Sequence, residues 1–259
     1  MALEKTKAFL AVTAPDAPKA QGLGMPCLCL YYRIGENGAL QRAQLQLSGR
    51  GGLMGLYEAP GLALCQPEKL ARDIQTECSR RGFGGVVVDF PVPGEELPRL
   101  ESLCAALKRL QVGVWLPEEL APWGGEEAIV IAPAAVSGGV FAEMVEALCR
   151  KYTPQRLCLD LVRGCQDFPM PAYDPDGRRL TAGELAELQA KTGAQSYFSR
   201  ELCCKYFTYR REDGSVHFVL FDDHDTAHAK LEHIRQAGVG QVLLLFSEWG
   251  REARELLGK

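Results

Sequence analysis

One helix-to-strand segment constrains the fold more than any other part of the chain. Residues 67–81 carry apolar side chains at helical spacing, and Gly82 ends the predicted helix. The run VVVDF follows at residues 86–90, and a short β-branched run after a helix is typical of a buried parallel strand. Its single acid, Asp89, stands at the carboxyl end, where barrel strands place their functional side chains. The segment predicts an α/β fold with Asp89 at its active end.

The same alternation of strand and helix patterns continues along the chain. Strands are predicted at residues 8–13, 27–34, 52–57, 86–90, 113–117, 127–131, 156–162 and 241–246. Helices are predicted over residues 67–81, 97–110, 140–152, 181–192 and 225–237. A hairpin is predicted over residues 207–210 and 216–221, across an Asp-Gly turn. The pattern favours a (β/α)8 TIM barrel over residues 1–259, with a small α+β insertion domain at residues 171–224.

Composition narrows the class of protein. The chain has 259 residues, 47% of them hydrophobic, which is enough apolar mass for a large core. A net charge of -4 and the lack of a dense Lys/Arg cluster argue against nucleic-acid binding. No apolar run approaches the roughly 20 residues of a membrane helix, and the first residues do not form a signal peptide. We therefore expect a cytoplasmic protein, and the sequence leaves the oligomeric state open.

The cysteines and histidines do not predict a metal centre. The chain has ten cysteines but no C-x-x-C pair, and most of them stand in apolar runs. We interpret them as buried free thiols that act as small hydrophobic side chains. The acids and histidines between Asp222 and His228 are interpreted as a helix start rich in capping Asp residues. No metal and no cofactor is expected.

Three stretches together resemble a known family. They are residues 28–40, the run GFGGVVVDF at residues 82–90, and a C-terminal block that contains KYFTY at residues 205–209 and DGSVHFVLFDD at residues 213–223. The chain resembles the spore-cortex N-acetylglucosaminidase branch of the family 18 glycoside hydrolases. This resemblance implies a barrel that binds N-acetylglucosamine polymers of the cell wall. It also implies catalysis in which the acetamide of the substrate attacks the anomeric carbon while one Glu acts as the acid.

The catalytic motif of that family is degenerate in this chain. The pattern D-G-x-D-x-D-x-E places its first two Asp positions on Gly84 and Val87, retains Asp89, and places the acidic Glu on Pro91. The sixth strand lacks the family's Met-x-Tyr-Asp. The Trp of the last strand is replaced near residues 245–246, and Trp249 comes several residues late. A proline cannot donate a proton, so the acid is absent from its usual position.

Several residues remain candidates for a site at the strand ends. The catalytic candidates are Asp89, Glu95 with its neighbour Glu96, and Glu118 with its neighbour Glu119. The ligand-binding candidates are Asp89, Tyr32, Glu58, Asp160 and Arg163. Each has an ordinary structural alternative. Asp89 could cap a loop, the paired Glu residues could be solvated, Asp160 and Arg163 could pair with each other, and Tyr32 could belong to the core.

Three hypotheses of function follow. The first is a catalytically inactive family-18-like protein that binds an N-acetylglucosamine-type oligosaccharide or acts as a scaffold in sporulation or at the cell wall. This hypothesis includes association with the spore. The alternative is an active glycoside hydrolase whose general acid has moved to another position. A protein that only binds other proteins would instead have its barrel mouth filled by side chains. A carboxyl group close to Asp89 in an open cleft would favour the hydrolase.

Overall fold

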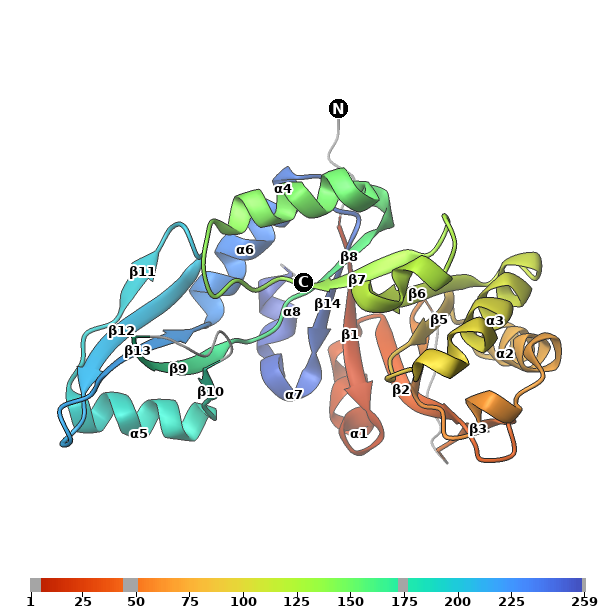
Figure 1. The fold of residues 1–259 in the computed structure, drawn as a ribbon, viewed down its shortest axis with the longest axis horizontal. Helices are drawn as coiled ribbons and strands as arrows, with labels where there is room; N and C mark the ends of the chain where they lie inside the picture. The colour runs from red at the N-terminus through yellow and green to blue at the C-terminus, as the bar shows by residue number, and fades with distance from the viewer. Residues whose placement is uncertain (1–5, 44–50, 172–176, 258–259) are drawn as a thin grey trace.

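The computed structural model describes residues 6–43, 51–171 and 177–257. Eight parallel strands form a closed barrel, because β1 pairs with both β14 and β2. The barrel strands are β1 (Lys7–Thr13), β2 (Cys27–Ile34), β4 (Leu53–Glu58), β5 (Gly85–Val88), β6 (Gly113–Pro117), β7 (Ile129–Pro133), β8 (Leu157–Asp160) and β14 (Gln241–Leu245). All eight predicted strands are confirmed, and so is the (β/α)8 barrel (Figure 1).

The helices surround this barrel. The longer ones are α2 (Pro67–Arg81), α3 (Leu97–Arg109), α4 (Phe141–Tyr152), α5 (Ala182–Thr192) and α6 (His224–Gln236). Short helices are α1 (Ala17–Ala20), α7 (Phe246–Trp249) and α8 (Glu252–Leu256). Between β2 and β4 the described residues form only the antiparallel strand β3 (Leu40–Arg42). Predicted helix signals are confirmed where Gly82 ends α2 with φ of 78° and Thr181 caps α5 in a capping box with Glu184.

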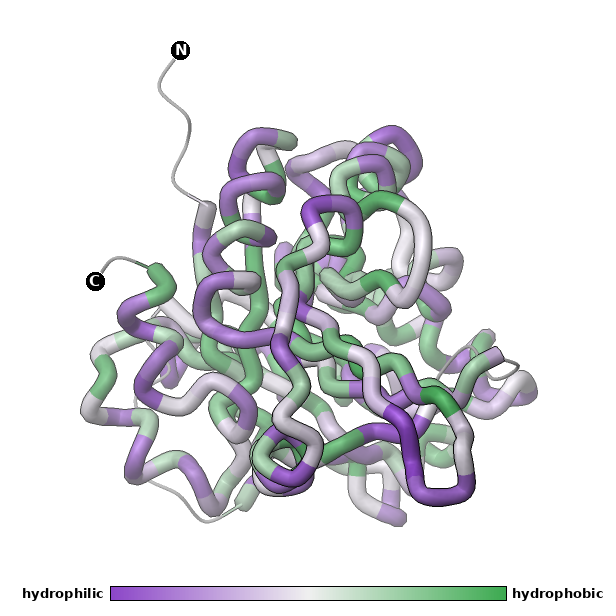
Figure 2. The backbone as a smooth tube through the Cα atoms, turned by 90° about the vertical axis from the view of Figure 1, so that its left-hand side faces the viewer, coloured by the Kyte–Doolittle hydropathy of each residue, from purple (hydrophilic) through white to green (hydrophobic). Residues whose placement is uncertain are grey.

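The interior of the barrel is filled by alternate strand residues. They form a cluster made of Phe9, Ala11, Leu28, Leu53, Val87, Trp115, Cys158 and Leu243. The Trp115 indole N–H donates to the Gln241 side chain at 2.8 Å near the amino ends of the strands. The intervening strand residues point outward and pack beneath the helices. Figure 2 shows hydrophilic and hydrophobic residues mixed along the helices at the surface of the molecule.

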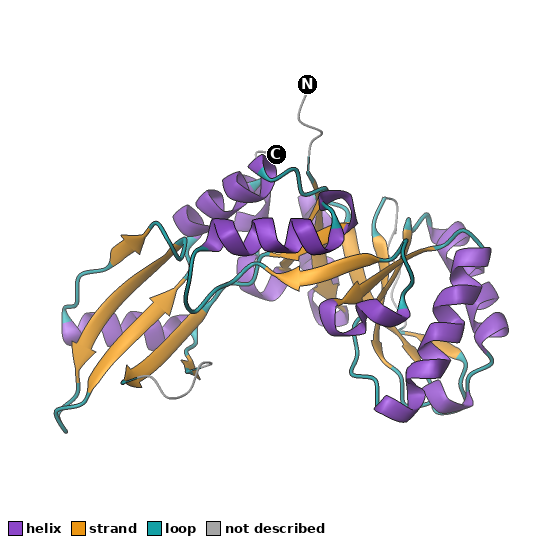
Figure 3. Ribbon diagram, turned by 45° about the horizontal axis from the view of Figure 1, so that its top comes forward, coloured by secondary structure: helices purple, strands orange, loops and turns teal. Residues whose placement is uncertain are grey.

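A second, five-stranded sheet lies beside the barrel. Its order is β10-β9-β13-β12-β11, formed by β9 (Cys165–Met170), β10 (Arg178–Arg179), β11 (Tyr197–Ser199), β12 (Cys204–Arg210) and β13 (Val216–Phe221). Helix α5 covers one face, where Leu185 and Leu188 pack on Leu180, Phe207 and Val219 (Figure 3). The predicted hairpin is β12–β13, turned at Gly214 with φ of 85°. Strand β9 follows β8 directly, so this sheet begins before residue 171.

A buried ion pair connects the second sheet to the barrel. Asp222 follows β13, and its carboxylate accepts from the Lys230 ammonium of α6 at 2.8 Å. The side chains of Asp222 and Lys230 are only 4% and 2% exposed. The same carboxylate accepts from the Gly164 N–H at 3.0 Å and the Thr226 hydroxyl at 2.8 Å. Gly164 lies between β8 and β9, so these bonds fix both chain crossings between the barrel and the second sheet.

Candidate functional site

The carboxyl ends of the barrel strands form the mouth on which α1 and α7 lie (Figure 1). Val87 and Cys158 both point into the barrel, and side chains two residues further along a strand point the same way. Asp89 and Asp160 are those next residues, so both face the mouth. The strands β5 and β8 that carry them are separated by β6 and β7. The predicted Asp89 and Asp160 are therefore brought to one end of the barrel, on strands that are not neighbours.

Asp160 is a carboxyl group that is difficult to ionise. Burial raises its pKa to about 7, and the negative charges of Glu248 and Asp89 act in the same direction. No hydrogen bond or ion pair to the Asp160 side chain is formed by any residue that the structure describes. The Asp160–Arg163 pairing that the sequence allowed is not formed. Near neutral pH, Asp160 is thus divided between a protonated and an ionised form.

Asp89 is more exposed than Asp160, although it lies at the same end of the barrel. The surrounding protein displaces part of its water, and this desolvation raises the pKa of Asp89, with a further contribution from the charge of Glu119. The negative charge of Asp89 in turn contributes to the raised pKa of Asp160, so the two carboxyl groups interact electrostatically.

Glu248 of α7 completes this group of acids and is firmly held. Its carboxylate accepts from the Arg163 backbone N–H at 2.9 Å and from the Arg179 guanidinium at 2.7 Å. Its side chain is 14% exposed. Arg163 also reaches the Glu248 carbonyl at 3.0 Å and lies 5.0 Å from the centre of the Trp249 ring. Arg163 is therefore engaged by Glu248 and Trp249, and Glu248 keeps a fixed negative charge near Asp160.

The other predicted acids lie at separate places around the rim. Glu95 is exposed in a short 3-10 helix before α3. Glu118 accepts from Lys151 at 2.9 Å and from the Tyr152 hydroxyl at 3.2 Å. Glu58 pairs with Arg33 at 3.4 Å on the surface. None of these three carboxylates contributes to the pKa shift of Asp89 or Asp160.

Tyr32 is placed on the opposite side of its strand from the mouth. Pairing between β2 and β4 is irregular at Leu30–Arg33, and such a bulge reverses the side to which the following residues point. Tyr32 is 1% exposed, and its hydroxyl donates to Glu77 of α2 at 3.0 Å. Its phenol therefore presents no surface to a ligand in this structure.

Two residues at the mouth have roles that the sequence did not suggest. Glu248 follows the last strand in a helix too short for a periodic pattern. Tyr57 is the next-to-last residue of β4, on the same side as Leu53, and is 39% exposed. The alternation of the strand could have identified Tyr57. An exposed aromatic ring beside carboxyl groups is the kind of surface on which a sugar ring packs.

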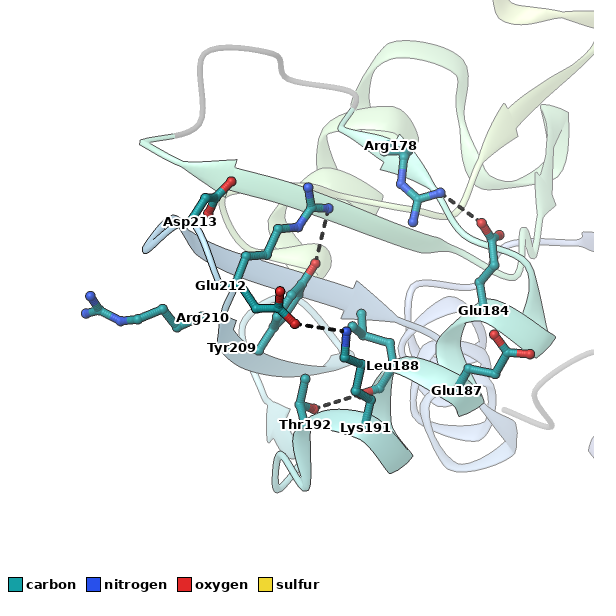
Figure 4. Close-up of a pocket in the computed structure, with 11 residues that line it drawn as sticks. Arg178, Glu184, Glu187, Leu188, Lys191, Thr192, Tyr209, Arg210, Glu212 and Asp213 are labelled. Atoms are coloured by element: carbon teal, nitrogen blue, oxygen red, sulfur yellow. Dashed lines mark hydrogen bonds and ion pairs between the residues drawn. The ribbon is translucent and has the colours of Figure 1, made fainter.

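A separate cavity of about 580 Å³ lies between α5 and the end of the β12–β13 hairpin (Figure 4). Its charged side chains largely pair with one another, as Arg178 does with Glu184 at 2.8 Å and Lys191 with Glu212 at 3.8 Å. Behind it, the buried Asp167 accepts from the Tyr209 hydroxyl and contacts His217 Nδ1, both at 2.8 Å. None of the predicted site residues lines this cavity.

The residues described contain no group of three or more His, Cys, Asp or Glu side chains arranged to hold a metal ion. The acids near His224 instead begin α6. Asp223 accepts from the Thr226 N–H at 3.1 Å and is paired with Lys205, which confirms the predicted capping role. All ten cysteines are free thiols, and most are buried. Within the described ranges, no helix has the length and apolarity to cross a membrane.

Comparison with known proteins identifies the fold. No family profile and no curated protein sequence matches the chain. Among solved structures, the spore cortex-lytic enzyme SleL of Bacillus cereus has a TM-score of 0.71 at 12% identity, over 98% of this chain and 74% of that one. SleL of Bacillus megaterium QM B1551 has a TM-score of 0.64 at 14% identity, over 97% and 73%. The chain has the fold of the family 18 glycoside hydrolases.

A family 18 chitinase from Cycas revoluta, solved in complex with (GlcNAc)4, shares this fold. Its TM-score is 0.64 at 12% identity, over 97% of this chain and 98% of that one. In the sequence resemblance described above, the position of the family's catalytic Glu falls on Pro91. Pro91 is exposed just beyond β5. In this structure the charge of Asp89 acts on Asp160, on the seventh strand around the barrel, and the charge of Glu119 acts on Asp89.

Proposed function

We propose that this protein binds an N-acetylglucosamine-type oligosaccharide at the mouth of its barrel. The observation that carries the proposal is a pair of carboxyl groups, Asp89 and Asp160, at the carboxyl end of a family 18 fold, to which no side chain of the described residues bonds. Ligands of TIM barrels bind at this end. Carboxylates accept hydrogen bonds from sugar hydroxyls, and the exposed ring of Tyr57 adds an apolar surface.

The names of the structural neighbours support this class of ligand. One neighbour is a chitinase in complex with (GlcNAc)4, and two are spore cortex-lytic enzymes. Oligomers of N-acetylglucosamine and cortex glycan fragments are therefore the first ligands to test. Because Pro91 has no proton to donate, we further propose that the acetamide-assisted reaction of the family does not occur. General acid catalysis contributes a factor of roughly 10² to 10⁴ to such reactions.

Isothermal titration calorimetry with N-acetylglucosamine tetramer tests the binding proposal. The Asp89→Ala variant should bind about tenfold more weakly, since a hydrogen bond to a charged group contributes about 1.5 kcal/mol or more. Glu95→Ala is the matched control, because Glu95 is an exposed acid outside the coupled pair. If titration of wild-type protein with the tetramer and with cortex fragments shows no heat of binding, the proposal is refuted.

The role of position 91 is tested with Pro91→Glu. If the family acid is what the chain lacks, this variant should gain hydrolysis that retains the configuration at the anomeric carbon. Two successive displacements, first by the acetamide and then by water, restore that configuration. Wild-type protein that releases products of retained configuration from an N-acetylated substrate would contradict the inference about Pro91.

A further inference from the structure

The mouth contains a second carboxyl group that the family motif does not include. We propose that Asp160 is the proton donor of a two-carboxylate glycosidase site in which Asp89 activates the attacking water. This inference rests on the proposed binding of an oligosaccharide at the mouth. It assigns the missing acid to the seventh strand of the barrel, instead of to position 91 or to the rim acids Glu95 and Glu118.

The placement of the two residues carries the argument. Asp160 is the last residue of β8, and its register partner on β14 is the interior residue Leu243. Asp89 comes directly after β5, and its backbone N–H donates to the Leu56 carbonyl of β4 at 2.8 Å. Both backbones are thus held by barrel strands. Two carboxyl groups on separate strands of one mouth can lie on either side of a bound sugar linkage, as glycoside hydrolysis requires.

Neither carboxyl group is engaged by the residues that surround it in the described ranges. In the described part of the chain, no side chain bonds to the carboxylate of Asp89 or Asp160. Two buried acids elsewhere are instead held by partners: Glu77 is bonded to Tyr32, Arg80 and Arg81, and Asp222 is bonded to Lys230. The lone pairs of Asp89 and Asp160 are therefore available to a ligand that enters the mouth.

The charges around Asp160 give the two groups opposite protonation states. The groups that affect Asp160 are Glu248 from α7 and Asp89 from β5, while Arg163 is turned toward Glu248 and Glu252. With its pKa raised to about 7, Asp160 holds a proton in much of the population at neutral pH, and the negative charge of Asp89 is one cause of that shift. Paired groups whose environments separate their pKa values in this way have the states required of an acid and a base.

The reaction follows from these two states. The carboxylic acid of Asp160 gives its proton to the glycosidic oxygen as the bond from that oxygen to the anomeric carbon breaks. A water oxygen forms a new bond to the anomeric carbon from the opposite face, and the Asp89 carboxylate takes the proton that this water loses. One linkage and one water become two free sugars, and exchange with solvent returns Asp160 and Asp89 to their starting states. This single displacement inverts the anomeric configuration.

The test compares wild type, Asp160→Asn and Asp89→Asn on two substrates. The first is the N-acetylglucosamine tetramer, and the second is an aryl glycoside whose dinitrophenolate leaving group needs no protonation. Asp160→Asn should lose about 10²- to 10⁴-fold in kcat on the tetramer and keep most of its activity on the aryl glycoside. Asp89→Asn should lose activity on both substrates. Rescue on the aryl glycoside separates a proton donor from a residue that only supports the fold.

Wild-type products should show inverted configuration by NMR, and kcat should fall above about pH 7 as Asp160 ionises. Equal loss on both substrates in Asp160→Asn, or products of retained configuration, would overturn the assignment. Binding of the tetramer by wild type without turnover of either substrate would also overturn it while leaving the proposed function intact. Absence of binding would remove both proposals.

Discussion

The buried pair of Asp222 and Lys230 gives the sharpest test of how the second sheet is attached to the barrel. Lys230→Met keeps the apolar stem and removes the ammonium that lies 2.8 Å from the carboxylate. Asp222, whose side chain is 4% exposed, would then retain the Gly164 N–H and the Thr226 hydroxyl as its donors among the described residues. Breaking one partner of such a buried pair typically costs about 3–5 kcal/mol, because the remaining charge is neither hydrated nor neutralised.

The assay is chemical denaturation of wild type and variant at neutral pH, followed by circular dichroism. In a thermal melt of a chain of this size, the same loss of unfolding free energy would lower Tm by roughly 6–20 °C. Lys191→Met is the matched control, because Lys191 and its partner Glu212 are 77% and 95% exposed at 3.8 Å. The control should change stability by less than about 0.5 kcal/mol. A loss below about 1 kcal/mol in Lys230→Met would refute the reasoning.

Three further predictions concern the mouth and one helix end. Tyr57→Ala should weaken binding of the N-acetylglucosamine tetramer about fivefold to tenfold in calorimetry, because the sugar loses the exposed ring on which it packs. Unchanged affinity would exclude this role of Tyr57. Asp160→Asn should be more stable than wild type at pH 8 and equally stable near pH 3.5 in urea denaturation. The pKa of Asp160 is about 7 in the folded state and about 3.9 in the unfolded state. The wild-type protein therefore has its full stability below about pH 3.9 and loses part of it as the pH rises toward 7 and Asp160 has to ionise in the folded state. An equal gain at both pH values would contradict this linkage. Gly82→Ala should cost about 1–2 kcal/mol, because φ is 78° at the end of α2, whereas Gly94→Ala meets no atom within 4 Å and should be close to neutral.

The barrel could be predicted from the sequence because its strands and its longer helices carry strong local patterns. The end of α2 at Gly82 and the caps at Thr181 and Asp223 matched their signals. The connections after the first two strands had weak signals. In the described ranges, short helical turns follow β1 and the strand β3 follows β2.

The mouth could be predicted only in part. Asp89 and Asp160 were found because strand ends have a known place in a barrel. Tyr32 was misplaced relative to a simple alternation, because the irregular pairing of β2 with β4 is not encoded in the residue types nearby. Glu248 was missed because its position depends on Arg163 and Arg179, which are far from it in sequence.

The buried free thiols can be used to measure local opening of the structure, because alkylation of a thiol requires access to its sulfur atom. Burial raises the pKa of Cys78 and Cys104 on α2 and α3 to about 12, and that of Cys204 on β12 to about 12 as well. At pH 8 an alkylating reagent can therefore reach these sulfur atoms only when the surrounding structure opens. The alkylation rates of Cys78 and Cys104 would measure how fast the barrel opens. The alkylation rate of Cys204 would measure how fast the second sheet opens. Mass spectrometry of the modified peptides would show whether the two parts open together or separately.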